Sequence, residues 1–93
     1  MFASHSMITT ENAQRCLSRL CRHWAHKFVV ELAADKGHIF FDPAHCWLSK
    51  AEGGLEVRLQ SPEQGELSEL EAVVAEHLQR MSAEEHLLIQ WVR

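Results

Sequence analysis

The stretch from Cys21 to Lys27 gathers the residue types from which metal sites are built. It holds two histidines, His23 and His26, together with a thiol, an indole and two cations. Two histidines three positions apart on a helix can reach one ion, and Cys21 or Cys46 would complete the mixed nitrogen and sulfur set that zinc or iron accepts. One hypothesis is therefore an iron, zinc or haem site on His23, His26 and Cys46.

Helical geometry favours a structural role for the same histidines. At 3.6 residues per turn, His26 and Cys21 lie roughly 140° apart around the helix, so both cannot point at one ion. The paired-cysteine spacing that marks many zinc sites is absent. An imidazolium at a helix end, next to Lys27, suits the negative end of the helix dipole and can bond the last carbonyls. We therefore predict no cofactor, and the metal site stays as the alternative.

A second chemical interpretation is a thiol nucleophile at Cys46, with a histidine as its base. Strand alternation would turn Cys46 toward the core together with Leu48, where a thiol is more often buried and inert than reactive. The sequence contains no glycine-rich phosphate loop and no nucleophile elbow. Catalysis is accordingly not the favoured class of function.

Basic side chains form a stripe along the first predicted helix. This basic stripe comprises Arg15, Arg19, Arg22, His26 and Lys27. Such a stripe is ordinarily a solvated helix face. Its functional interpretation is the docking of an acidic protein partner or a carboxylate ligand, which arginine binds through paired hydrogen bonds. It could equally pair with the glutamates of the second helix, where each exposed ion pair contributes about 0 to 1 kcal/mol.

The composition is that of one soluble globular domain spanning residues 1–93. Apolar residues make up 46% and charged residues 24%. A net charge of −4 argues against nucleic acid or anionic lipid as the partner. No apolar run approaches the roughly 18 residues that a membrane span needs. Three cysteines without a secretory signal favour reduced thiols, so we expect the protein in the cytoplasm.

Hydrophobic periodicity divides the chain into two helices and five strands. A period of 3.6 residues predicts helices at about 10–26 and 61–81, and a period of two predicts strands at 28–32, 38–41, 44–50, 55–60 and 87–92. Residues 1–8 are expected to be flexible or extended. Gly37 is expected to supply a positive φ in the first hairpin turn.

The order α-β-β-β-β-α-β predicts an α+β two-layer sandwich. Short connections make the first four strands an antiparallel meander, and two one-sided amphipathic helices can bury their apolar stripes only against one face of that sheet. The other face of an antiparallel sheet of four to five strands then stays open.

The open sheet face is the predicted functional surface. By strand alternation it carries a ligand or partner surface of Phe40, His45, Trp47, Arg58 and His38. Exposed aromatic side chains gathered in this way mark an interface, and we expect a homodimer through stacked sheets ahead of a small ligand. In the alternative, Phe40 and Trp47 merely cover each other as a cross-strand pair. We therefore predict a small accessory or binding module.

Residues 13–28, with the run His23-Trp24-Ala25-His26-Lys27, resemble the first helix of a bacterial family, domain of unknown function 2218. Further matches are Gly37 with Ile39 and Phe41, Cys46 with Leu48, and residues 55–59, 73–78 and 87–91, so the resemblance covers nearly the whole chain. The family has no assigned activity, so the resemblance implies no mechanism. Members that lie beside iron and siderophore utilisation proteins imply an iron-linked metal-, haem- or siderophore-related function as the alternative.

Overall fold

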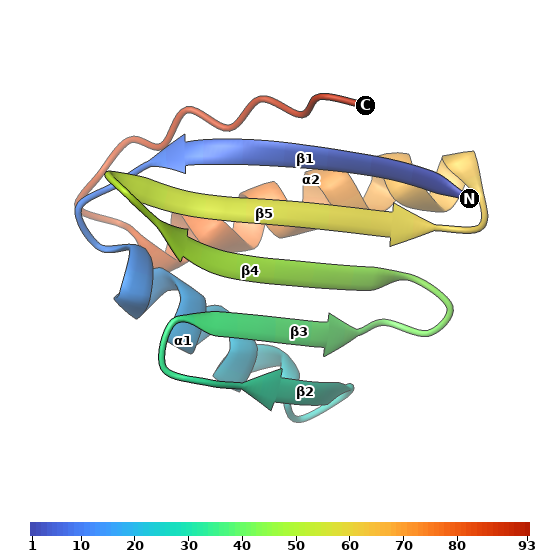
Figure 1. Ribbon diagram of the computed structural model, residues 1–93, viewed down its shortest axis with the longest axis horizontal. Coiled ribbons are helices and arrows are strands. Elements are labelled where there is room, and N and C mark those ends of the chain that lie inside the picture. Colours follow the sequence, from blue (N-terminus) through green and yellow to red (C-terminus); the bar gives the residue numbers. More distant parts are fainter.

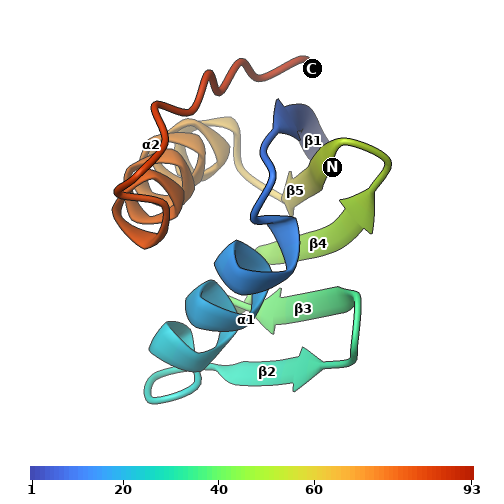
Figure 2. The ribbon, with the colours of Figure 1, turned by 90° about the vertical axis from the view of Figure 1, so that its left-hand side faces the viewer.

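A computed structural model of residues 1–93 shows a five-stranded antiparallel sheet with both helices on one face (Figure 1). The elements in chain order are β1 (Phe2–Thr9), α1 (Ala13–Trp24), β2 (Val29–Leu32), β3 (Lys36–Phe40), β4 (His45–Ala51), β5 (Gly54–Ser61) and α2 (Gln64–Met81). The strands lie side by side in the order β1-β5-β4-β3-β2. Seen from the side, the helices form one layer and the sheet the other (Figure 2).

The predicted fold class is confirmed: the protein is an α+β two-layer sandwich with an open antiparallel sheet. The meander β2-β3-β4-β5 and the two helices occur in the predicted order, because short turns join neighbouring strands and each helix has one apolar stripe. Neither helix has the length and apolarity that crossing a bilayer requires.

The fifth strand comes from the amino-terminal end of the chain. The segment expected to be flexible or extended is extended, and it pairs with β5 from Phe2 opposite Ser61 to Thr9 opposite Gly54. The predicted closing strand, 87–92, is reduced to a single antiparallel bridge between His5 and Val92, with hydrogen bonds of 2.9 and 2.8 Å. The chain therefore begins, rather than ends, with a sheet strand.

The core lies between the sheet and the helix layer. Alternate residues of each strand point into it, together with one stripe from each helix. The largest fully buried apolar side chains are Ile8, Leu17, Leu20, Ile39, Leu48, Leu55, Leu59, Leu67 and Leu78. All three cysteines are buried and unpaired.

Residue Glu85 holds the start of α1. Thr10 Oγ1 and Asn12 Nδ2 donate hydrogen bonds of 2.6 and 2.8 Å to Glu85 Oε1. These two bonds lower the pKa of the Glu85 carboxyl, because they favour its ionised form. Helix α1 ends at Trp24, two residues earlier than predicted, and His26 lies in the turn that leads to β2.

The expectation of a positive φ at Gly37 is wrong, since Gly37 lies within β3, and Gly53, with a φ of 74°, is the glycine in the left-handed region. Gly37 instead allows α1 to approach the sheet closely. A Cβ atom at Gly37 would lie 2.5 Å from the Cys21 sulfur, which is fully buried. The absence of a side chain on the strand therefore sets the distance between α1 and β3.

We expect Gly37→Ala to lower the free energy of unfolding by about 1 to 3 kcal/mol, because the added methyl group overlaps the Cys21 sulfur in a packed core. Removing that sulfur relieves the overlap, so Gly37→Ala combined with Cys21→Ala should cost less than the sum of the two single changes. Urea denaturation of the three variants measures this coupling. Gly65→Ala is the control, since a Cβ there meets nothing within 4 Å. Strictly additive costs would contradict the contact.

Candidate functional site on the open sheet face

Strand register arranges the open face into three transverse rows. The central row takes one residue from every strand: His5, Arg58, Trp47, His38 and Glu31. On one side lies the Phe40 row, formed by Ala3, Gln60, His45, Phe40 and Val29. On the other lies the Lys36 row, formed by Met7, Glu56, Ser49 and Lys36. Alternation with the buried core residues keeps all these side chains away from the helices.

Four rings gather at the middle of this face. His38 stacks on Phe40 and on Trp47, with ring centroids 3.8 and 4.7 Å apart. His45 stacks on Trp47 at 5.3 Å, and His38 Nε2 and His45 Nδ1 share a hydrogen bond of 3.0 Å. In the alternative interpretation, Phe40 and Trp47 cover each other as a cross-strand pair. The structure shows no such pair, because the antiparallel register places a histidine opposite each of them.

Burial and two neighbours determine the charge of His38. Its side chain is 20% exposed, and Glu31 Oε1 lies 3.8 Å from its Nδ1. Desolvation lowers the pKa of His38 from its ordinary value of 6.5, and His45 lowers it further, whereas Glu31 acts in the opposite direction. The neutral form of His38 therefore predominates at pH 7, and the positive charge of the central row is that of Arg58.

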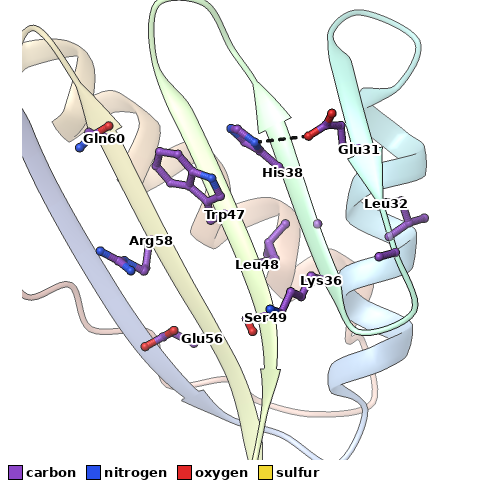
Figure 3. Close-up of a pocket in the computed structure, with 12 residues that line it drawn as sticks. Glu31, Leu32, Lys36, His38, Trp47, Leu48, Ser49, Glu56, Arg58 and Gln60 are labelled. Carbon is purple, nitrogen blue, oxygen red and sulfur yellow. Dashed lines mark ion pairs between the residues drawn. The ribbon is translucent and has the colours of Figure 1, made fainter.

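A shallow hollow of about 600 Å³ lies beside Trp47 (Figure 3). Arg58, Glu56 and Gln60 reach it from β5, while Lys36 and Glu31 border it from β3 and β2. Its chemistry combines an indole with separate positive and negative groups. Such a surface can stack on another aromatic ring and pair with charges of either sign.

The predicted metal ligands His23, His26 and Cys46 do not come together in the structure, which gives this part of the alternative no support. Cys46 is completely buried on β4, whereas both histidines are exposed at the end of α1. No group of three or more histidine, cysteine or acidic side chains is placed to hold an ion. Burial raises the pKa of the Cys46 thiol, and it raises that of Cys21 to about 11, which leaves both thiols in their unreactive form.

The basic stripe is partly used within the molecule. Arg15 forms an ion pair with Glu84, and Arg19 donates a hydrogen bond of 3.2 Å to the Met81 carbonyl. These contacts tie α1 to the last residue of α2 and to the turn after it. Arg22, His26 and Lys27 remain exposed and form no ion pair.

Sequence reasoning found the five central residues of the open face but missed its β1 edge. His5 and Met7 belong to β1, which was not predicted as a strand. Leu88 and Gln90, which a closing strand would have added to the face, instead border a hollow at its edge with these two side chains. Periodicity gave no clear signal for β1, because two of its three inward positions are the serines Ser4 and Ser6.

The fold and this surface define a small α+β domain with one helix-covered and one open, aromatic sheet face. Residues 5–92 match a family described as an uncharacterized protein conserved in bacteria, DUF2218, and the chain belongs to this family. It is also similar to a solved structure, "NMR structure of PA4090 from Pseudomonas aeruginosa", with 43% identity over 99% of this chain and 96% of that one, and a TM-score of 0.84. No curated protein matches the chain.

An NMR pH titration should place the midpoint of His38 below 6.5. Glu31→Gln should lower the midpoint further, and His45→Phe should raise it, because each removes one charged or chargeable neighbour. Because the pKa of His38 is lower in the folded protein than in the unfolded chain, the unfolded chain binds a proton there at higher pH. The free energy of unfolding should therefore fall as the pH is lowered through 6.5. Glu52→Gln, in the β4–β5 turn, is the matched control. An upward shift in Glu31→Gln would refute the assignment.

Proposed function

We propose that the protein is a small binding module whose open sheet face is a protein-interaction surface, and that a second copy of the chain occupies it. The observation that carries this proposal is the order of charges across the central row and the Lys36 row. Positive and negative groups lie at opposite sides of β4, so the face is complementary to itself when reversed.

Consider two copies placed face to face about a two-fold axis that runs parallel to the strands along β4. Strand β5 of one copy then faces β3 of the other, and β1 faces β2. Each row meets itself in reverse order. In the central row His5 faces Glu31 of the second copy, and Trp47 faces its own equivalent across the axis. Arg58 faces His38, which is neutral at pH 7 because its pKa is lowered.

The two flanking rows are complementary under the same operation. In the Lys36 row, Glu56 faces Lys36 of the second copy, and the symmetry repeats this pair on the other side of the axis. In the Phe40 row, the small Ala3 faces Val29, whose side chain is 68% exposed. A two-fold axis along the central row would instead place Arg58 of one copy against Arg58 of the other. The charges therefore favour the axis along β4.

The size of the face suits a stable dimer. The molecule measures 32 by 26 Å in the plane of the sheet, which allows a footprint of up to about 800 Å² per copy, close to a standard interface. Face-to-face sheets pack about 10 Å apart with their strands nearly aligned, as this axis requires. Half-buried aromatic rings at the centre with charges at the rim are typical of interfaces.

The free cysteines support a reducing compartment for this module, such as the cytoplasm. The iron-linked, haem or siderophore-related alternative gains no such support, because its three residues are separated. The docking of an acidic partner on the basic stripe has only Arg22, His26 and Lys27 left to offer, since Arg15 and Arg19 are engaged.

Sedimentation equilibrium should show a dimer of the natural sequence, and Trp47→Ser should be monomeric at the same concentration. Glu56→Lys and Lys36→Glu should each weaken the dimer about ten-fold or more, since each places like charges opposite each other twice per dimer. The double variant with Glu56→Lys and Lys36→Glu should restore dimerisation, because opposite charges face each other again. Glu52→Lys, a charge reversal off the face, is the control.

A monomer at millimolar concentration would overturn the proposal. In that case, a shift of the Trp47 ring resonances on addition of benzoate would assign the face to a small carboxylate ligand instead. Dimerisation that survives both single charge reversals would refute this arrangement of the two copies.

A further inference from the structure

A second concave surface lies on the opposite side of the molecule, in the helix layer. This helix groove, of about 600 Å³, runs between the end of α1 and residues 66–77 of α2. Its lining residues are His23, Trp24, His26, Lys27, Phe28, Phe41, Ala44, Glu66, Glu69, Leu70, Val73 and His77. Because the groove is on the helix side of the sheet, the dimer proposed above leaves it open, and the inference below does not depend on that dimer.

The floor of the helix groove is apolar and fixed in place. Trp24 is only 6% exposed, and the Phe41 ring packs edge-on against it with centroids 5.0 Å apart. Phe28 packs edge-on against Phe41 at 4.8 Å, and His77 lies against Trp24 at 4.6 Å. A floor of mutually packed rings is preformed, so a ligand that covers it would not have to order these side chains.

The two walls of the helix groove carry opposite charges. Lys27 and His26 form the wall at the end of α1, and Glu69 and Glu66 form the wall on α2. No ion pair or hydrogen bond joins the two walls, although Glu66 accepts a hydrogen bond of 2.5 Å from the Ser61 hydroxyl. Separate positive and negative groups therefore flank an apolar floor.

We propose that the helix groove binds a short peptide with free termini and apolar side chains. The carboxylate of such a peptide would pair with Lys27, its ammonium group with Glu69, and its side chains would cover Phe28 and Phe41. A free amino acid carries both charges on groups bonded to one carbon atom and has no apolar stretch between them. Three extended residues place them roughly 10 Å apart, and a tripeptide suits a groove of this volume.

The probe for this site is the tripeptide Ala-Phe-Ala, compared with its N-acetylated and its C-amidated forms. An NMR titration would follow the amide resonances of Ala44 and Val73. We expect each blocked peptide to bind about five-fold more weakly than the free one, since each lacks one partly exposed ion pair. Lys27→Met and Glu69→Gln should each weaken binding of the free peptide by a similar factor. Lys50→Met and Glu52→Gln, which are exposed outside the groove, are the matched controls.

The cycle of variants and blocked peptides assigns each charge to its wall. Glu69→Gln should not weaken the N-acetylated peptide further, and Lys27→Met should not weaken the C-amidated peptide further. All the exchanged side chains are exposed, so the variants should keep the fold. The proposal is overturned if the free peptide leaves Ala44 and Val73 unmoved at millimolar concentration, or if blocking either terminus has no effect.

Discussion

The close contact between α1 and β3 at Gly37 determines how the two layers meet. With no side chain at this position, the helix settles so near the strand that the Cys21 sulfur occupies the space of the missing Cβ. The apolar stripe of α1 then reaches Ile39 and Leu48 directly, and Trp24 is carried down into the core. A helix held further away would leave these side chains unpacked, and dispersion contacts decline steeply across even a small gap.

The two helices cover one face of the sheet and leave the other face open, and the candidate surface is this open face. Both helices present a single apolar stripe, so both lie on the same face. The exposed side chains of five strands are then brought into register by the backbone ladder. Three rows follow from pairing alone, and two of them carry opposite charges on the two sides of β4. The aromatic rings meet at the centre because β3 and β4 lie inside the sheet.

Most of the fold could be predicted from periodicity, since Leu55, Val57 and Leu59 alternate cleanly in β5 and α1 has a regular apolar stripe. Strand β1 could not, because its inward positions include Ser4 and Ser6, which are buried although they are polar. Residues 87–92 show the opposite case. Their pattern is apolar and predicts a strand, but their backbone pairs with β1 at one point only. The local sequence pattern shows which side chains prefer burial. Which segment becomes a strand also depends on which edge of the sheet is free to pair with it.

The same distinction applies to the two surfaces. The residue types of the open face were predictable from alternation, but which of them lie opposite one another requires the register of all five strands. The helix groove could not be foreseen, because it arises from the offset between the two helices as well as from their lengths. Helix α1 has 12 residues and α2 has 18, and the contacts of Arg15 with Glu84 and of His23 with His77 show that they run antiparallel.

The two antiparallel helices are offset, since the start of α1 lies beside the turn after α2, where Arg15 pairs with Glu84. His23, the last residue but one of α1, already lies against His77, so the first half of α2, which carries Glu66 and Glu69, extends beyond the end of α1. The chain fills only part of that space with the turn after Trp24 and the loop before β4. The acidic wall is thus separated from the basic one by the early end of α1, while Arg15 and Arg19 close the opposite end of the helix layer.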